Sequence, residues 1–396
     1  MSEVSIENYR GIAPSGAVDF LYQISKPLKG KKMLHVNSTS YGGGVAEMLQ
    51  KLIPLFQNLG INARWEVIEG NQDFFATTKA FHNTLQGKEQ EITEKMLQAY
   101  IDCNAENAKK MNLDCDVAII HDPQPAALVD ARKTGKWIWR FHPNISKPVK
   151  STWEFLSKYV EKYDASIYSL PEYAQRLNHP QFLIYPSIDP LSDKNRELSE
   201  EEVKKHMEVM EIPTDKPILL QVSRFDRFKD PIGVIQAYKK VKSHNDCRLV
   251  LVGGAAADDP EGAEVLAEVK DVAGDDSDIH LLTSKSDVEV NALQTAATIV
   301  FQKSTSEGFG LTVSEAMWKS KPVIGGRVGG ITTQLLHDMT GYTVDTVEGA
   351  AFYARYLLNN PTKANEIGQR AKEYVRSNFL VTRHLGDYMA LMSLMS

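Results

Sequence analysis

Apolar and polar positions alternate with two different periods along the chain, and the first half shows both. Short, near-continuous apolar runs predict β-strands, whereas segment 45–60 repeats its apolar residues at helical spacing and ends at Gly60. Polar segments between 73 and 110 predict two more helices. The predicted strands of this half lie within 31–37, 61–70, 115–128, 135–144, 165–173 and 182–190.

The same order of elements begins again after the charged, helix-forming segment 192–210. A strand within 216–225 is followed by a helix at 230–242, which Asp230 and Pro231 open. Apolar strands that alternate with helices are typical of parallel sheets covered on both faces. The sequence therefore predicts an α/β protein with two doubly wound domains and a cleft between them. Its remaining strands are predicted within 247–254, 278–284, 297–304 and 321–330.

The last predicted helix lies near the end of the chain, within 379–395. One side of it is apolar, because Leu385, Tyr388, Met389 and Met392 follow i, i+3, i+4, i+7 spacing. This face needs a domain to pack against, and the spacing leaves open which of the two it covers.

Composition narrows the class of protein. The chain has 396 residues, 42% of them hydrophobic and 24% charged, which suits two domains of ordinary size. The formal net charge is −6, and no basic run opposes it. Nucleic acid and anionic membranes are therefore not expected as partners.

The compartment is indicated by three further observations. Residues 1–26 lack a basic start followed by an apolar core, so we expect no secretory signal. No stretch reaches the roughly 20 apolar residues of a membrane span. Cys103, Cys115 and Cys247 have no CxxC spacing and fit buried thiols in a reducing environment. We expect a cytoplasmic protein.

Ligands of open α/β sheets bind at the carboxyl ends of the strands, so the loops there hold the candidate residues. Segment 38–48 places Gly43 and Gly44 before a helix, where backbone N–H groups can approach a phosphate. It lacks the GxGxxG pattern of nicotinamide enzymes, which disfavours an oxidoreductase. The alternative is a flexible turn without a ligand.

A second loop, 222–231, carries two cations between a strand and a helix. Arg224 offers a planar fork and Lys229 a compact point charge, and together they suit a diphosphate. Taken alone, both could equally be solvated surface charges.

A third loop holds two carboxylates, Glu307 and Glu315. On one helix they would be about 12 Å apart along the axis, too far for a retaining glycosidase pair. The glycines instead place Glu307 in the loop and Glu315 in the first helical turn. We expect Glu307 to bind the hydroxyls of a sugar and Glu315 those of a ribose. A phosphate is the expected partner of the backbone N–H groups of Phe309, Gly310, Leu311 and Thr312. The competing interpretation is a capping box, with Thr312 at the N-cap and Glu315 at N3.

Histidines end two strands of the first half. His121 and His142, with Asp122 and Gln124 nearby, could bind the hydroxyls of a second sugar, although a single histidine is usually structural. Asp114 and Asp116 match a short DxD metal pattern, but they precede a strand, at the end opposite to ligands. We predict no metal site there or elsewhere.

In combination, these motifs resemble a known family. Segment 306–317, with Arg224 and Lys229 upstream, resembles the retaining glycosyltransferases of family four, which have the GT-B architecture of two facing Rossmann-like domains. Segments 35–49, 121–128 and 137–146 look like the trehalose-forming glycosyltransferring synthases, relatives of the trehalose phosphorylases. The resemblance covers most of the chain. It implies a nucleoside diphosphate glucose as donor and free glucose as acceptor, joined α,α-1,1 in a reversible reaction.

The resemblance also implies domain limits and residue roles. The first domain would comprise 1–190 with 379–396, on the acceptor side, and the second 191–378, on the nucleotide-sugar side. The catalytic residues would be His142, Arg224, Lys229 and Glu307. The donor would be bound by Gly43, Gly44, Arg224, Lys229, Glu307, Phe309, Gly310, Leu311, Thr312 and Glu315, and the acceptor by His121, Asp122, Gln124 and His142.

Other expectations concern partners and rivals. No cofactor is expected, although Mg²⁺ could accompany free nucleotide, and a homodimer is left open. A trehalose phosphorylase would use the same site with inorganic phosphate. Another sugar transferase of family four, a sugar-nucleotide 2-epimerase and a non-catalytic sugar-nucleotide sensor are further alternatives.

Overall fold

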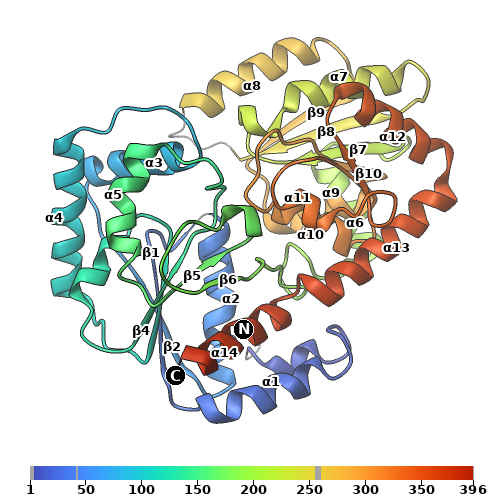
Figure 1. Ribbon diagram of the computed structural model, residues 1–396. Coiled ribbons are helices and arrows are strands. Elements are labelled where there is room, and N and C mark those ends of the chain that lie inside the picture. Colours follow the sequence, from blue (N-terminus) through green and yellow to red (C-terminus); the bar gives the residue numbers. More distant parts are fainter. Residues whose placement is uncertain (1–3, 42, 255–259, 396) are drawn as a thin grey trace. The chain divides into compact units, whose positions relative to one another are not determined.

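The computed structural model describes residues 4–41, 43–254 and 260–395, so Gly42 of the glycine-rich segment lies outside the described residues. The chain divides into two compact units, Met1–Ser187 with Val381–Ser396, and Ile188–Leu380. Each unit holds a six-stranded parallel sheet flanked by helices (Figure 1). The predicted α/β architecture with two doubly wound domains is therefore confirmed.

The first unit contains the sheet with strand order β2-β1-β3-β4-β5-β6. Its strands are β1 (Lys32–Asn37), β2 (Asn62–Val67), β3 (Val117–His121), β4 (Lys136–Arg140), β5 (Ala165–Tyr168) and β6 (Gln181–Leu183). Its helices are α1 (Ala17–Ser25), α2 (Gly44–Asn58), α3 (Gln72–Leu85), α4 (Glu94–Lys110), α5 (Lys150–Val160) and α14 (Val381–Met395). Short 3₁₀ helices are η1 (Ile6–Tyr9), η2 (Lys26–Leu28), η3 (Ala126–Ala131) and η4 (Pro171–Tyr173).

Successive residues of these strands enter two separate cores, because their side chains point to opposite faces of the sheet. Met33 and Ile119 lie in one core with α1, α2 and α14. Leu34 and Ile120 lie in the other, with α3, α4 and α5. Both faces are thus buried, which explains why the strands are apolar without alternation.

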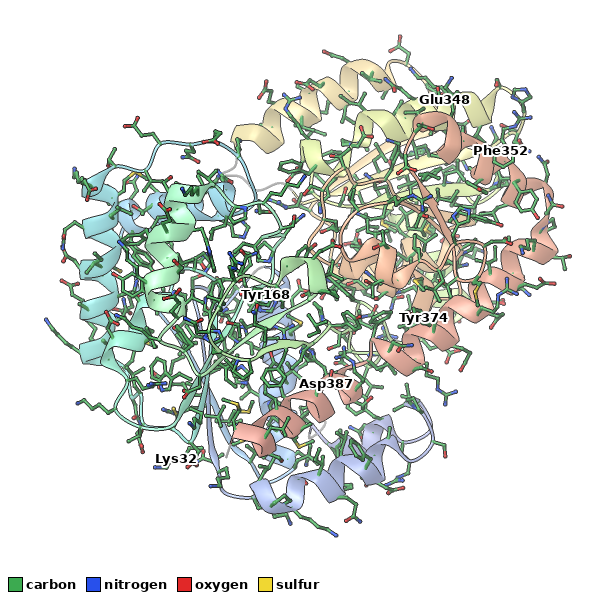
Figure 2. The ribbon with its side chains drawn as sticks, viewed as in Figure 1. Lys32, Tyr168, Glu348, Phe352, Tyr374 and Asp387 are labelled. Atoms are coloured by element: carbon green, nitrogen blue, oxygen red, sulfur yellow. The ribbon has the colours of Figure 1, made fainter. Side chains whose placement is uncertain are left out.

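The C-terminal helix α14 packs on the first unit, beside α1 and α2 (Figure 1). Leu385, Tyr388, Met389 and Met392 are all buried there, so the predicted apolar face is confirmed. On the same helix, Arg383 donates to the carbonyl oxygens of Tyr185 and Pro186 and pairs with Asp387, which Figure 2 labels.

The second unit contains the sheet with strand order β12-β11-β10-β7-β8-β9. Its strands are β7 (Ile218–Val222), β8 (Arg248–Gly253), β9 (Ile279–Thr283), β10 (Ile299–Gln302), β11 (Val323–Gly326) and β12 (Tyr342–Val344). Its helices are α6 (Glu200–Val209), η5 (Arg227–Lys229), α7 (Pro231–Lys242), α8 (Pro260–Ala273), α9 (Asp287–Ala296), α10 (Leu311–Trp318), α11 (Ile331–Gln334), α12 (Val347–Asn359) and α13 (Pro361–Asn378).

Local predictions in this unit have mixed outcomes. Helix α7 begins at Pro231, and Asp230 caps it by accepting the N–H of Gly233, as predicted. Cys247 and, in the first unit, Cys115 are buried free thiols, whereas Cys103 is only half-buried.

Within the described ranges, no helix combines the length and apolar composition needed to cross a bilayer.

Candidate active site

Both sheets reverse their strand order beside their first strand, and such switch points are where open α/β sheets bind ligands. In the first unit the reversal lies between β1 and β3, whose carboxyl ends lead to Gly43 and to His121. In the second it lies between β7 and β10, which lead to Lys229 and to Glu307. Each switch point therefore carries residues that the sequence predicts to be functional.

Lys229 and Glu307 form an ion pair at the switch point of the second unit. The distance from Nζ to Oε2 is 2.6 Å, and only 17% and 11% of the two side chains are exposed. Ser304 donates its hydroxyl to the same carboxylate oxygen at 3.3 Å. Lys229 ends η5 and Glu307 lies in the loop after β10, as predicted.

Two further cations lie in the same two loops, after β7 and after β10, and each meets a carboxylate. Arg224 lies on the exposed side, with 61% of its side chain accessible, and contacts Asp226 at 2.9 Å. Lys303, which directly follows β10, is buried and pairs with Asp230. Sequence analysis missed Lys303, although a lysine at the end of an apolar strand was a usable signal.

The helix that follows Glu307 begins at Leu311, without the capping box that was one of the two interpretations of its sequence. Gly310 is its N-cap, with φ of 81°, a left-handed conformation that favours glycine, and no side chain caps it. The capping box is therefore wrong. Thr312 lies inside the first turn and donates its hydroxyl to Gln302 of β10 at 3.0 Å. Among the described residues, the N–H groups at this helix start have no side-chain cap, and they stand at the positive end of the helix dipole.

Glu315 is the fifth residue of α10, so its predicted place in the first turn is wrong by about one residue. It is buried. One turn later, Lys319 donates to the backbone oxygens of Glu315 and Lys194 and to Oδ1 of Asn195. Burial lowers the pKa of Lys319 to about 7, while the nearby Glu315 charge opposes the shift.

The loop before α10 is held from behind by one amide. Nε2 of Gln334 donates to the backbone oxygen of Phe309 at 2.6 Å, and Ser314 donates its hydroxyl to Oε1 of the same side chain. Gln334 is fully buried and was missed by sequence analysis. Its hydrogen bonds hold the backbone of Phe309 and Gly310 in place at the start of α10.

In the first unit, the glycine-rich segment leads directly into α2. Gly43 is the N-cap with φ of 82°, and a Cβ added there would meet nothing within 4 Å. Gly44 is the first helical residue. Among the described residues, no side chain caps this helix start, as the predicted approach of backbone N–H groups to a phosphate requires.

His121 and His142 belong to a hydrogen-bonded row of three imidazoles. Nε2 of His121 lies 2.9 Å from Nδ1 of His35, and its Nδ1 lies 2.9 Å from Nε2 of His142. His121 is only 2% exposed, so its ring meets histidines on both sides, whereas His142 is half-buried. Sequence analysis missed His35, whose signal was a histidine within an apolar strand.

Asp122 and Arg140 complete this group. Asp122, with φ of 66°, accepts the backbone N–H of His142 at 3.0 Å. Burial raises the pKa of Asp122 to about 7, against the effects of that N–H and of Arg140. Arg140 was also missed: it is buried, donates from Nε to Nδ1 of His142 at 3.5 Å and from Nη2 to the oxygen of Ile184.

The remaining predicted polar residues of this unit lie at its two ends. Oε1 of Gln124 is buried without a hydrogen-bond partner among the described residues, so it can still accept a ligand hydroxyl. Asp114 and Asp116 lie at the opposite end of the sheet, where both contact Lys32 at the start of β1. Figure 2 shows Lys32 and Tyr168, which ends β5, at opposite ends of the sheet.

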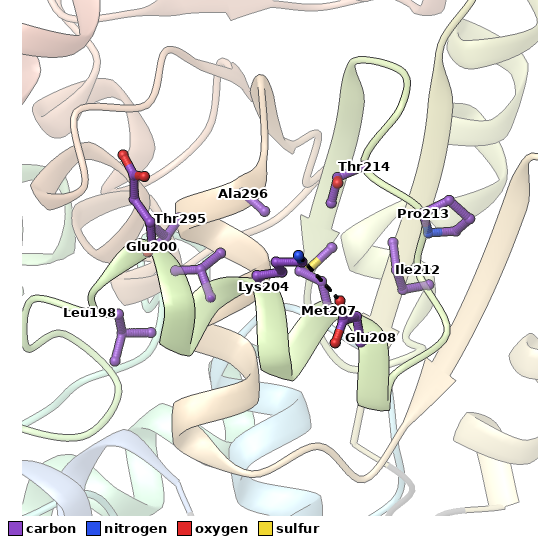
Figure 3. A pocket seen from close by; sticks show the side chains of 11 residues that line it. Leu198, Glu200, Lys204, Met207, Glu208, Ile212, Pro213, Thr214, Thr295 and Ala296 are labelled. Carbon is purple, nitrogen blue, oxygen red and sulfur yellow. Dashed lines mark ion pairs between the residues drawn. The ribbon is translucent and has the colours of Figure 1, made fainter.

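A cavity of about 510 Å³ opens elsewhere on the second unit (Figure 3). Side chains from the segment 198–214, which contains α6, line it together with Thr295 and Ala296 at the end of α9. Lys204 and Glu208, which also line the cavity, form an ion pair. These segments precede β7 and β10, so the cavity lies at the amino ends of the strands. No predicted site residue lines it.

Comparison with known proteins shows the family of this chain. Residues 35–175 match the family "Trehalose synthase, N-terminal domain", and residues 202–374 match "Glycosyl transferases group 1". The trehalose synthase of Pyrococcus horikoshii is 45% identical, covering 98% of this chain and 96% of that protein. The chain belongs to the trehalose synthase family. The trehalose synthase of Rubrobacter xylanophilus is 41% identical with the same coverage.

Solved structures show the same fold at lower identity. An α,α-trehalose-phosphate synthase (UDP-forming) from Burkholderia xenovorans, in complex with glucose-6-phosphate, superposes with a TM-score of 0.73 at 12% identity, covering 92% of this chain and all of that one. Membership of the trehalose synthase family confirms the expected family and class of enzyme, a hexosyltransferase.

Proposed function

We propose that this protein transfers glucose from a nucleoside diphosphate glucose to free glucose, forming α,α-1,1-trehalose reversibly and with retention at the donor's anomeric carbon. The relatives named trehalose synthase support the product. The observation that carries the donor half is the Lys229–Glu307 ion pair beside the uncapped start of α10. A diphosphate sugar presents an anion and hydroxyls, the two partners that this cation and this carboxylate need.

When the donor binds, Lys229 would contact its diphosphate and Glu307 its glucose. The diphosphate would replace Glu307 as the partner of Lys229, with Arg224 and the N–H groups of α10 as further donors. The Glu307 carboxylate would then accept hydrogen bonds from hydroxyls of the glucose. Buried Glu315 is the proposed partner of the ribose.

The reaction then depends on stabilising the diphosphate as it leaves, and no side chain has to act as a nucleophile. The bond between the anomeric carbon and the diphosphate oxygen breaks, and the negative charge on the diphosphate is stabilised by Lys229, Arg224 and the helix N–H groups. The acceptor hydroxyl oxygen bonds to the same face of the anomeric carbon, and its proton passes to the departing diphosphate oxygen. Holding both sugars with the acceptor hydroxyl beside the departing diphosphate oxygen supplies the rest of the rate.

The test is incubation of the protein with glucose and with ADP-, UDP- or GDP-glucose in turn. We expect one disaccharide, with α,α-1,1 linkage by NMR, and one equivalent of nucleoside diphosphate. Turnover of trehalose with inorganic phosphate alone, giving glucose 1-phosphate, would instead identify a phosphorylase. Donor that binds without any turnover would identify a sensor.

A further inference from the structure

The imidazoles of His35, His121 and His142 form a chain in which the proton positions depend on one another. The planes of neighbouring rings are inclined by only 23° and 15°, with centroids 5.2 Å apart, and each of the two nitrogen–nitrogen contacts measures 2.9 Å. Such a contact needs an N–H on one ring and a lone pair on the other. In neutral rings, the tautomer of one histidine therefore dictates the tautomer of the next.

By themselves, the two contacts allow either direction of donation. In one direction Nε2 of His142 donates to His121, and Nε2 of His121 donates to His35. In the other direction every proton sits on Nδ1, and Nδ1–H of His142 points at Arg140. Nε of Arg140 lies 3.5 Å from that nitrogen, and a guanidinium can only donate. Two donors would then face each other, so Arg140 selects the first direction.

The surroundings keep the three rings neutral. Burial lowers the pKa of all three histidines, and the Arg140 charge acts in the same sense. Among the described residues, the other titratable groups around these rings include Asp122, His384 and Tyr388. Of these, Asp122 accepts a backbone N–H, and the pKa of His384 is also lowered by burial.

The far end of the chain is compatible with the same direction. Nε2 of His35 is buried without a hydrogen-bond partner among the described residues. The ring of His35 packs at 88° to Tyr388, with centroids 5.5 Å apart. A neighbouring aromatic ring can serve as a weak acceptor for an N–H, the group that the first direction of donation places on Nε2 of His35.

We propose that Arg140, acting through this row of rings, holds His142 in the Nε2–H tautomer, so that His142 offers a substrate hydroxyl only an acceptor, at Nδ1. The 3.5 Å contact to Arg140 is at the long limit of a hydrogen bond, so a hydroxyl can compete for this nitrogen. Arg140, His121 and His35 are then positioning residues. The use of His142 for a sugar rests on the proposed function, whereas the tautomer does not.

The tautomer is measured on the full, ligand-free chain by NMR with ring-¹⁵N histidine. Protonated and bare ring nitrogens differ strongly in ¹⁵N shift, and single His→Gln variants assign His35, His121 and His142 among the ten histidines. We expect a bare Nδ1 and a protonated Nε2 in all three. A protonated Nδ1 on His142, or a mixture of tautomers, would overturn the proposal whatever the substrate is.

The link to catalysis is tested with Arg140→Met, which removes the donor, and Arg140→Lys, which retains a cationic donor. We expect Arg140→Met to give mixed tautomers at His142 and to lower kcat/KM for a sugar substrate about tenfold, the size of one lost neutral hydrogen bond. Arg140→Lys should recover part of both. His179→Asn, a half-buried histidine of the same unit that contacts Ser166, is the control and should change neither.

Each outcome separates the two parts of the inference. A changed tautomer with unchanged kcat/KM for donor and acceptor would disprove the assigned use of Nδ1. If Arg140→Met does not fold, as judged by circular dichroism, the wild-type spectrum decides the tautomer and Arg140→Lys carries the kinetic comparison.

Discussion

The ammonium of Lys229 lies 2.6 Å from a carboxylate oxygen of Glu307, although 78 residues separate them. The contact exists because β7 and β10 are neighbours in the sheet, with Leu219, Leu220 and Gln221 in register with Ile299, Val300 and Phe301. The loops after two adjacent parallel strands emerge at the same edge, which brings cation and carboxylate together.

Replacing Lys229 by alanine should lower kcat about 10²-fold or more, the loss expected when one donor to a developing anion is removed. Arg224→Ala should have an effect of the same order, since both cations are assigned to the leaving diphosphate. Steady-state kinetics with the nucleotide sugar identified by the activity assay provide the measurement. Lys240→Ala is the control, because Lys240 is exposed and pairs with Glu348 of helix α12. Near-normal rates in both site variants would exclude the leaving-group role.

Gly310→Ala should both destabilise the second unit and reduce activity. With φ of 81°, an L-residue there costs about 1–2 kcal/mol, and its Cβ would stand 3.2 Å from Cγ of Glu307. Gly274→Ala isolates the backbone cost, because φ is 63° there and nothing lies within 4 Å of the added Cβ. Urea denaturation should show similar losses for the two variants, and only Gly310→Ala should raise the KM for the donor. Equal KM values would show that Glu307 does not depend on this glycine.

Because of Asp122, the free energy of unfolding should decrease as pH rises through the acid range. Its folded pKa is raised to about 7, chiefly by burial, so between about pH 4 and pH 7 the folded state holds a proton that the unfolded state has released. The free energy of unfolding therefore decreases as pH rises through this window. Asp122→Asn should remove that decrease in denaturant titrations at several pH values. Asp130→Asn, at an exposed ion pair, should retain the wild-type slope.

Because of Lys319, the free energy of unfolding should increase as pH rises through the alkaline range. Because its folded pKa is lowered to about 7, the unfolded state binds more protons between about pH 7 and pH 10, and its contribution to stability increases with pH. Lys319→Met should flatten this increase. Lys204→Met, at an exposed side chain of α6, is the control and should leave the pH dependence as in the wild type. An unchanged slope in Lys319→Met would show that the ammonium stays charged on its three oxygen acceptors.

Local patterns predicted much of the fold, because they depend on neighbours in sequence. The spacing of Leu385, Tyr388, Met389 and Met392 identified the buried side of α14. Asp230 and Pro231 marked the start of α7, since proline suits the first helical position. Strands buried on both faces were recognisable from their continuous apolar runs.

The start of α10 shows where local reasoning fails. Thr312 and Glu315 have capping-box spacing, yet the hydroxyl of Thr312 binds Gln302, a residue of β10. The helix instead begins after Gly310. A true capping box occurs at Ser199, whose hydroxyl accepts the N–H of Glu202 while its own N–H donates to the Glu202 carboxylate.

The sequence by itself determined most of the succession of strands and helices, although not the short strand β12, together with the family and which loops carry cations, carboxylates and histidines. These features depend on residue type and spacing. Only the tertiary structure decided the partners of these groups. Lys229 meets Glu307, and Arg140 meets His142 within a row of imidazoles, because strand order sets which loop ends are adjacent. Strand order follows from the packing of the whole sheet, and no single segment of the chain contains it.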